Sequence, residues 1–262
     1  MCFYNGILVS RAEYIRLMDL EIQLGEYAEQ MQHPLQSGFE YGSWPVVRFN
    51  EASGMAELEM MHWDFMPSYF RTMKDVERFH HGGMNPKTGK KDPPKNMLNA
   101  IGEEMLDKPT FRKAALNRRC LVLSSGFYEW RHFTPPGSAK DIAYPYFISL
   151  KGKEYFFMAG IWQEWTDQDT GEMLNSFALV TTKANSLMEQ IHNKKKRMPL
   201  IFTESMAREW IRPDLQENRI REMVHFQIPS ADMEYYTLEK KFRESGSPMQ
   251  SFQYPELPSI QS

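Results

Sequence analysis

Cysteine and long apolar runs are both scarce in this chain. Two cysteines in 262 residues are too few for a disulfide framework, which predicts a reducing compartment. The longest apolar runs, such as residues 155–161, are far shorter than the roughly 20 residues of a membrane-spanning helix. No basic stretch followed by an apolar segment opens the chain, so we expect no secretory leader. These absences together predict a soluble, cytoplasmic protein without a membrane partner.

Positive charge is not in excess either. The chain carries 31 lysines and arginines against 34 acidic residues, which gives a net charge of −3. This balance argues against binding polyanions over the whole surface. A local basic groove remains open, because phosphate contacts depend on where the cations lie. A hydrophobic fraction of 42% is enough to bury a full core in one large domain or two small ones.

The order of predicted elements favours an α+β fold over a doubly wound one. No internal repeat and no linker stand out within residues 1–240, and strands are interrupted by single helices without regular β-α-β alternation. Residues 10–31 are predicted to form a helix, because Ser10 and Glu13 make a capping-box pair and apolar residues recur at helical spacing. The predicted strands are rich in β-branched and aromatic residues and cover 44–49, 56–63, 120–124, 127–131, 144–150, 155–161, 177–182 and 198–202.

Shorter helices and loops separate these strands. We expect helices at 110–116 with Thr110 as N-cap, at 185–191, and from Thr203 to about residue 211. The Gly, Pro and Lys content of residues 80–96 predicts a long exposed loop. Residues 244–262 are rich in Ser, Pro and Gln, which predicts a disordered tail.

Cys2 directly follows the initiator methionine, and this position gives it chemistry that an internal cysteine lacks. Once Met1 is removed, an α-amine and a thiol belong to one residue. Such a 1,2-aminothiol condenses with an aldehyde to an imine and then closes through sulfur to a five-membered thiazolidine. An α-amine has an ordinary pKa of roughly 7.7–8.0, so part of it is neutral and nucleophilic near neutral pH. Cys2 is therefore a candidate nucleophile.

Four further polar positions could serve such a nucleophile. Asn99 lies in LNAIGEEM, Glu129 lies in GFYEW, and His192 lies at the end of a short predicted helix. Each also has an ordinary interpretation. Asn99 could be a turn residue, Glu129 an exposed carboxylate on a strand, and His192 a histidine that the helix dipole favours. Glu103 follows Asn99 by four residues, and it either braces Asn99 or a neighbouring arginine or is a common helix-start carboxylate.

Five segments of the chain occur in the order of a known family. They are Met1-Cys2; WPVV at 44–47 with HWDFMPS at 62–68; NAIGEE at 99–104 leading into KPTFRKAALNRRCLVLSSGFYEW at 108–130; FFMAGIW at 156–162; and TTKAN with IHNKKKRMPLIF within 181–202. Through these segments, residues 1–212 resemble the SOS response-associated peptidase (SRAP) family, whose members sense abasic sites in DNA.

The resemblance implies an SRAP-like α+β domain over residues 1–240, with an antiparallel barrel-like β core and flanking helices. We expect a monomer without cofactor or metal, which would associate with the nucleoid when it acts on DNA. Its partner would be single-stranded DNA that contains abasic sites, bound covalently through a thiazolidine at Cys2. Asn99 would hold the sugar or the cysteine terminus, Glu129 would shuttle protons, and His192 would donate to the sugar oxygen. These roles agree with what carbinolamine dehydration and sugar-ring opening require of an acid and a donor.

The resemblance also implies DNA contacts, some of which this chain alters. Tyr4 and Ile101 stand where the family has arginines expected to contact phosphate, and Asp64 adds a negative charge where the family has glycine. The lysine triplet 194–196, Arg197 and the loop residues Lys87, Lys90 and Lys91 are hypothesised to compensate. The residues expected to bind DNA are Trp44, Pro45, Trp63, Lys194, Lys195, Lys196, Arg197, Met198 and Pro199.

Several alternatives stay open at this point. Trp44 and Trp63 either stack on bases or pack in the core. Cys2 and His192, with Asn99 as orienter, could instead form the nucleophile and base of a thiol peptidase or autopeptidase. The chain could also be a non-covalent binder of single strands with a vestigial site. His80 and His81 lack partners at metal-ligand spacing, so no metal site is expected, and Cys120 is expected to be a buried, inert thiol.

Overall fold

The computed structural model describes residues 2–9, 14–17, 20–23, 27, 29–84 and 88–261. Within these ranges, no helix is both long enough and apolar enough to span a bilayer.

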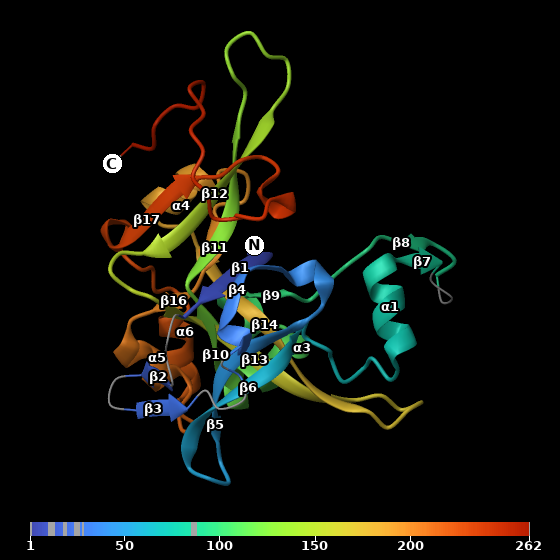
Figure 1. Ribbon diagram of the computed structural model, residues 1–262. Helices are drawn as coiled ribbons and strands as arrows, with labels where there is room; N and C mark the ends of the chain where they lie inside the picture. The colour runs from blue at the N-terminus through green and yellow to red at the C-terminus, as the bar shows by residue number, and fades with distance from the viewer. Residues whose placement is uncertain are drawn as a thin grey trace.

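Five strands at the centre of the molecule close into a barrel (Figure 1). The ring is completed by β14, which pairs with β13 on one side and with β6 on the other. Only the β14–β6 contact within this ring is parallel. The predicted α+β class with a barrel-like core is therefore confirmed. In ring order the strands are β14 (Met173–Lys183), β6 (Met55–Trp63), β5 (Ser43–Asn50), β10 (Arg119–Ser124) and β13 (Phe156–Thr166).

A second sheet carries the beginning of the chain and shares the main core with the barrel. Its order is β17-β12-β11-β1-β4, and Asn5 of β1 lies opposite Phe127 of β11. The first residue of β11, Gly126, has no room for a side chain, because the Phe147 ring would lie 2.1 Å from a Cβ atom at this position. The strands are β17 (Met233–Thr237), β12 (Ile142–Leu150), β11 (Gly126–Phe133), β1 (Tyr4–Leu8) and β4 (Gln32–Ser37).

The short strands extend these sheets or form small hairpins. β9 (Asn99–Ile101) and β15 (Arg197–Pro199) pair with β14, and β16 (Ile201–Phe202) pairs with β13. The remaining pairs are β2 (Tyr14–Leu17) with β3 (Leu20–Gln23), and β7 (Gly83–Met84) with β8 (Lys91–Asp92).

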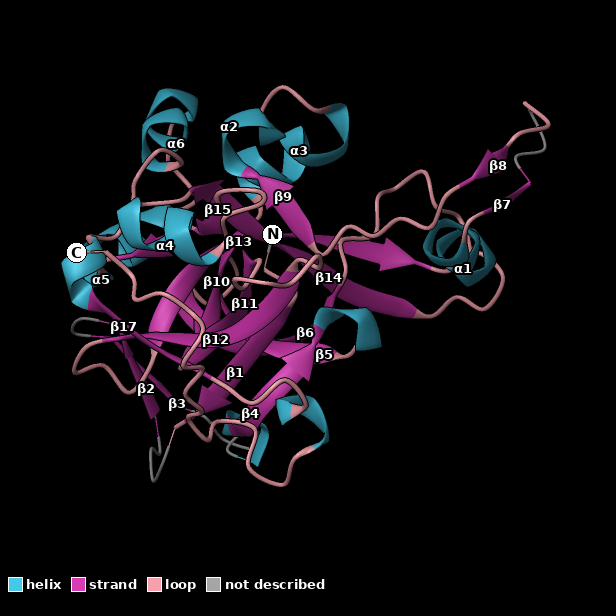
Figure 2. Ribbon diagram, turned by 90° about the horizontal axis from the view of Figure 1, so that it is seen from above, coloured by secondary structure: helices cyan, strands magenta, loops and turns pink. Residues whose placement is uncertain are grey.

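Helices α2, α3 and α6 gather on one side of the strands, whereas α1 stands apart with β7 and β8 (Figure 2). The α-helices are α1 (Met73–His81), α2 (Gly102–Met105), α3 (Pro109–Asn117), α4 (Ser186–Ile191), α5 (Glu204–Trp210) and α6 (Glu217–Met223). Short 3-10 turns are η2 (Glu29–Met31), η3 (Gly38–Glu40), η4 (Ser230–Asp232) and η5 (Phe242–Glu244).

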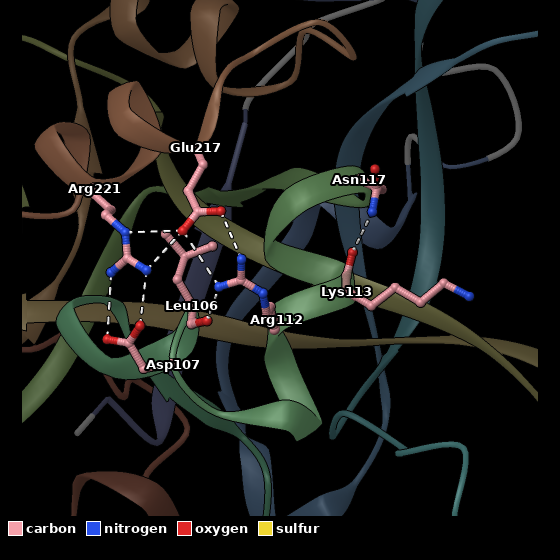
Figure 3. Close-up of polar contacts among 7 residues, drawn as sticks. All are labelled: Leu106, Asp107, Arg112, Lys113, Asn117, Glu217 and Arg221. Carbon is pink, nitrogen blue, oxygen red and sulfur yellow. Dashed lines mark hydrogen bonds and ion pairs between the residues drawn. The ribbon is translucent and has the colours of Figure 1, made fainter.

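An exposed ion-pair network joins α3 to α6 (Figure 3). Glu217 of α6 accepts hydrogen bonds from Arg112 of α3 at 2.8 Å and from Arg221 at 2.8 Å. Arg221 also reaches Asp107, which lies between α2 and α3, at 2.9 Å. We call Asp107, Arg112, Glu217 and Arg221 the α3–α6 network.

Most of the predicted central elements are confirmed. The eight predicted strands correspond to β5, β6, β10, β11, β12, β13, β14 and the pair β15 and β16. The predicted helices near 185–191 and after Thr203 are α4 and α5, and Thr203 caps α5 by accepting a hydrogen bond from Met206 N. The N-cap prediction at Thr110 is wrong, because α3 begins one residue earlier at Pro109, a residue favoured in the first helical turn.

The predicted helix over residues 10–31 is wrong. The described part forms the β2–β3 hairpin, in which Ile15 lies opposite Ile22. The hydroxyl of Tyr155 accepts from the Arg16 amide at 2.7 Å and lies 3.2 Å from the Arg16 carbonyl oxygen, so both groups of this strand residue meet a distant side chain. Tertiary contacts thus override the helical spacing. The expected capping pair, Ser10 and Glu13, lies outside the described residues.

Two predicted irregular regions also differ from expectation. Residues 80–84 and 88–96 are not a simple loop, since α1 extends to His81 and a β7–β8 pair follows. The tail, predicted to be disordered, contacts the second sheet, and Gln261 shares two hydrogen bonds with Gln190 of α4. There Tyr254 donates to the Leu238 carbonyl at 2.7 Å and packs edge-on against Tyr144 at 4.8 Å.

Candidate functional site

Cys2 lies two residues before β1 and is fully buried. Its thiol donates a hydrogen bond to the Tyr4 carbonyl at 3.5 Å, and its own carbonyl accepts from the Asn99 amide at 2.9 Å. Burial raises the pKa of the Cys2 thiol, and the negative charge of Glu129 raises it further. The thiol is therefore un-ionised near neutral pH, and the carboxyl of Glu129 lies close enough to influence it.

Glu129 reaches this site because of strand alternation along β11. Its neighbour Tyr128 packs with Phe147 and Phe242 on the opposite face, so Glu129 points toward the barrel side of the sheet. Only 4% of Glu129 is exposed, and burial raises the pKa of its carboxyl to about 8. The carboxyl is thus mostly protonated at neutral pH, which suits it to act as a proton donor.

His192 faces Glu129 from the end of α4. Its Nε2 atom lies 3.8 Å from a Glu129 carboxyl oxygen, and its Nδ1 atom lies 2.7 Å from the Arg197 carbonyl. Burial lowers the pKa of His192 to about 4. Because a carbonyl only accepts, the neutral ring carries its proton on Nδ1 and turns the lone pair of Nε2 toward Glu129. Near neutral pH this pair is an uncharged acid beside an uncharged base, not an ion pair.

Asn193, which the sequence motifs did not single out, fixes the loop after α4 to β11. Its amide nitrogen donates to the His132 carbonyl at 2.7 Å, and its amide oxygen accepts from the His132 N–H at 3.0 Å. His132 is three residues beyond Glu129 on the same strand. The two hydrogen bonds therefore hold His192 and Glu129 at a set separation. Adjacency to the predicted histidine was the only sequence feature that could have pointed to Asn193.

Arg197 also stabilises the position of His192. Its guanidinium forms a two-bond ion pair with Glu103, at 2.9 and 2.7 Å, and donates to the Thr181 carbonyl at 2.7 Å. Lys196, which precedes it, adopts a positive φ of 49° and donates its N–H to the His192 carbonyl at 2.8 Å. Of the roles left open for Glu103, the ion pair supports bracing a neighbouring arginine, and Glu103 also lies in the first turn of α2.

Several residues expected to bind DNA lie in the core instead, which corrects the prediction for them. The indole N–H groups of Trp44 and Trp63 donate to the carbonyls of Leu123 at 2.8 Å and Leu98 at 3.0 Å. Each tryptophan is 1% exposed, so neither face is accessible to a base. Apolar side chains without solvent contact stabilise the fold rather than a nucleic-acid surface. The buried residues of this set are Trp44, Pro45, Trp63, Met198 and Pro199.

The lysine triplet, by contrast, is exposed. Lys194 forms an ion pair with Asp141 at 2.9 Å. Burial has the largest effect at the site, since it raises the pKa of Glu129 and lowers that of His192. The positive charge of Lys195 lowers both pKa values. Lys195 is thus the member of the triplet that influences both groups. Lys90 and Lys91 are exposed at the β7–β8 pair, and Lys87 lies outside the described residues.

Asp64 does not place an exposed negative charge near the site, contrary to expectation. It is fully buried, accepts from the Met97 N–H at 2.7 Å and contacts His80 Nε2 at 2.7 Å. The His80 ring stacks on Tyr41 with centroids 3.8 Å apart. These contacts tie α1 to the barrel. Cys120 is buried in β10, as expected for an inert thiol.

The closed mixed barrel and the candidate site beside Cys2 agree with the family that the sequence comparison identifies. The chain belongs to the SOS response associated peptidase (SRAP) family, whose model matches residues 1–245.

Similar proteins agree with this assignment. The abasic site processing protein YoqW of Bacillus subtilis (strain 168) is 34% identical over 140 residues, which are 53% of this chain and 58% of that protein. The abasic site processing protein YedK of Escherichia coli (strain K12) is 24% identical over 204 residues, 76% of this chain and 79% of that protein. A crystal structure of a protein from Bacteroides thetaiotaomicron has a TM-score of 0.74 at 27% identity and covers 95% of this chain and 97% of that chain. The chain thus spans less than two thirds of the first of these relatives.

Proposed function

We propose that this protein captures abasic sites in single-stranded DNA by forming a thiazolidine with Cys2 after loss of Met1. The observation that carries the proposal is the gathering of an uncharged carboxyl, a neutral imidazole and a carboxamide around Cys2. Such a set suits proton transfer to and from a sugar aldehyde. The names of the similar proteins support abasic sites as the class of substrate.

Two buried acceptors support a role for the α-amine of mature Cys2. Among the described residues, neither Asn99 Oδ1 nor Glu129 Oε1 has a hydrogen-bond donor. Buried acceptors without donors are costly and cluster at functional sites. A terminal amine at Cys2 supplies more N–H donors than the single N–H of an amide linked to Met1. We infer that Asn99 and Glu129 hold this amine toward the sugar.

The reaction then needs only groups of this chain and the DNA. The neutral α-amine attacks the aldehyde carbon of the ring-opened sugar, and the resulting carbinolamine loses water when the Glu129 carboxyl protonates its hydroxyl. The Cys2 sulfur attacks the carbon of the resulting iminium ion, and the thiol proton passes to the Glu129 carboxylate, which restores the carboxyl. One aldehyde and one aminothiol thus give one thiazolidine and one water. During ring opening, His192 Nε2 takes the Glu129 proton and donates it to the sugar ring oxygen, while the anomeric hydroxyl returns its proton to the Glu129 carboxylate.

A crosslinking assay tests this function. A uracil-containing single strand is treated with a uracil glycosylase and incubated with the protein, and the product is heated and resolved on a denaturing gel. We expect a heat-stable adduct whose intact mass equals the chain without Met1 plus the DNA minus one water. The Cys2→Ala variant should form none, whereas Cys120→Ala, which removes the other cysteine, should form it normally. A wild-type protein without an adduct, or one that retains Met1, would end the proposal.

The thiol peptidase alternative receives less support from the geometry. A cysteine protease needs a thiolate beside its histidine, but burial raises the pKa of the Cys2 thiol. Asn99 donates to the Cys2 carbonyl, and the His192 Nδ1 atom contacts Arg197. If a Cys2 blocked on its amine still cleaved peptides and no longer crosslinked DNA, the peptidase interpretation would replace ours.

A further inference from the structure

Arg243 lies beside the first strand, although almost the whole chain separates it from Cys2 in sequence. Its Nη1 atom donates to the Tyr4 hydroxyl at 2.9 Å, and its guanidinium lies 5.5 Å from the centroid of the Tyr4 ring. The Tyr4 ring in turn packs edge-on against Trp130, with centroids 5.0 Å apart. Figure 1 shows the segment after β17 crossing β11 near the start of β1.

This arginine is not needed to anchor its segment. Phe242 does so, because it is 2% exposed and stacks on Tyr128 with centroids 5.2 Å apart. Arg243 itself is exposed, and no carboxylate of the described residues forms an ion pair with it. A guanidinium has five N–H donors, of which Tyr4 takes one. A positive charge with unused donors therefore faces solvent beside the half-buried Tyr4 ring.

Tyr4 connects this cation to the candidate site. Its carbonyl accepts the hydrogen bond of the Cys2 thiol, while its hydroxyl contacts Arg243. Trp130 makes a second connection, since it directly follows Glu129 in β11. The aromatic rings and the Glu129 carboxyl lie on opposite faces of β11. Tyr4 is two residues from Cys2, and Arg243 contacts its side chain, so Arg243 is a nearby cation for a phosphate that adjoins a sugar held at Cys2.

We propose that Tyr4, Trp130 and Arg243 form a platform that binds the nucleotide adjacent to the captured sugar. The guanidinium pairs with its phosphate, and the Tyr4 ring, which packs against Trp130, holds the guanidinium in place. The inference rests on the proposed function, and it assigns phosphate binding to a residue that no family motif contains.

The test uses binding without chemistry. The probe is a single-stranded oligonucleotide with one tetrahydrofuran residue, an abasic analogue that has no aldehyde. We compare wild type with Arg243→Gln, Arg243→Lys and Lys113→Gln. Lys113 is exposed on α3, and its side chain extends away from the α3–α6 network (Figure 3). Lys113→Gln therefore removes the same charge at a distant position.

We expect Arg243→Gln to weaken binding roughly 3- to 10-fold and to lower the slope of log affinity against log salt by about 0.7. Arg243→Lys should keep the slope, and Lys113→Gln should change neither quantity. If Arg243→Gln matches Lys113→Gln, or lowers only the melting temperature, then Arg243 merely holds its segment and the platform is refuted. Crosslinking by the wild type, measured in parallel with a true abasic site, reports separately on the proposed function.

Discussion

Two clusters of titratable groups have shifted pKa values with opposite results: the groups at the site become neutral, and those in the α3–α6 network stay charged. At the site, burial raises the pKa of Glu129 to about 8 and lowers that of His192 to about 4, so both groups become neutral. In the α3–α6 network, hydrogen bonds from Arg221 lower the pKa of Glu217 and of Asp107, so both stay charged. The difference is exposure to water: the network is solvated, whereas the site is not.

This comparison separates two uses of similar residues. A solvated network with every charge paired contributes to packing between helices, and its loss changes little because water replaces each partner. A buried pair that has lost its charges is ready to exchange protons, which is the property expected of a functional site. The predictions below test that distinction, beginning with the largest expected effect.

Replacing Glu129 with glutamine should affect reaction and stability differently. The amide keeps the shape of the carboxyl but cannot donate a proton, so we expect the single-turnover crosslinking rate to fall roughly 10²- to 10⁴-fold. The melting temperature should stay the same or rise, because a buried ionisable group is removed. Gel quantification of the adduct and a thermal melt measure the two quantities. An unchanged rate would remove Glu129 from the mechanism.

The Asn193→Ala variant should weaken the coupling between His192 and Glu129 without removing either group. Loss of both hydrogen bonds to His132 frees the loop after α4, and we expect a rate decrease of roughly tenfold, since small displacements of positioned groups are costly. Hydrogen exchange of the His132 amide should become faster. A slower reaction with unchanged exchange at His132 would contradict this explanation.

Stability should respond to pH in a defined window. The folded protein keeps the Glu129 proton between the ordinary pKa of 4.5 and about 8, so stability falls as pH rises through that range. His192 acts oppositely between about 4 and 6.5, because there the unfolded chain binds the extra proton. The two effects largely cancel up to pH 6.5, and a net fall remains from 6.5 to 8. Denaturant titrations across this window should show the fall in wild type and its loss in Glu129→Gln.

The smallest effect is expected in the α3–α6 network. Glu217→Gln removes a carboxylate that pairs with Arg112 and Arg221 in water. We expect a small decrease in melting temperature that disappears at high salt, and no change in crosslinking rate. A decrease in rate here would show that the two clusters are coupled.

The sequence predicted the centre of the molecule better than its periphery. Every residue of β10 is buried, and its apolar run at 120–123 is typical of a buried strand. The positions of Cys2, Asn99, Glu129 and His192 beside one another followed from the family resemblance, since residues so far apart in sequence reveal no distances. The hairpin at β2 and β3 was missed because its apolar spacing also fits a helix, and contacts with distant residues such as Tyr155 favour strands.

The burial of individual side chains was the property that the sequence predicted least well. Trp44 and Trp63 are aromatic residues within family motifs, and such residues serve equally as stacking surfaces or as core. Their indole N–H groups find backbone acceptors inside the barrel, which is the arrangement that makes full burial possible. Arg243 was missed for the opposite reason, because it lies close to the segment predicted to be disordered and belongs to no motif.

The edges of the second sheet have a consequence for self-association. At one edge, Pro34 interrupts the row of N–H donors along β4. At the other edge, the Phe252 amide donates to the Thr237 carbonyl at 2.8 Å, and Ser251 bridges to Leu238, so the chain's own end covers β17. Both edges thus carry a feature that hinders pairing with a second molecule, and removal of Ser251 and Phe252 would expose the Thr237 end of β17.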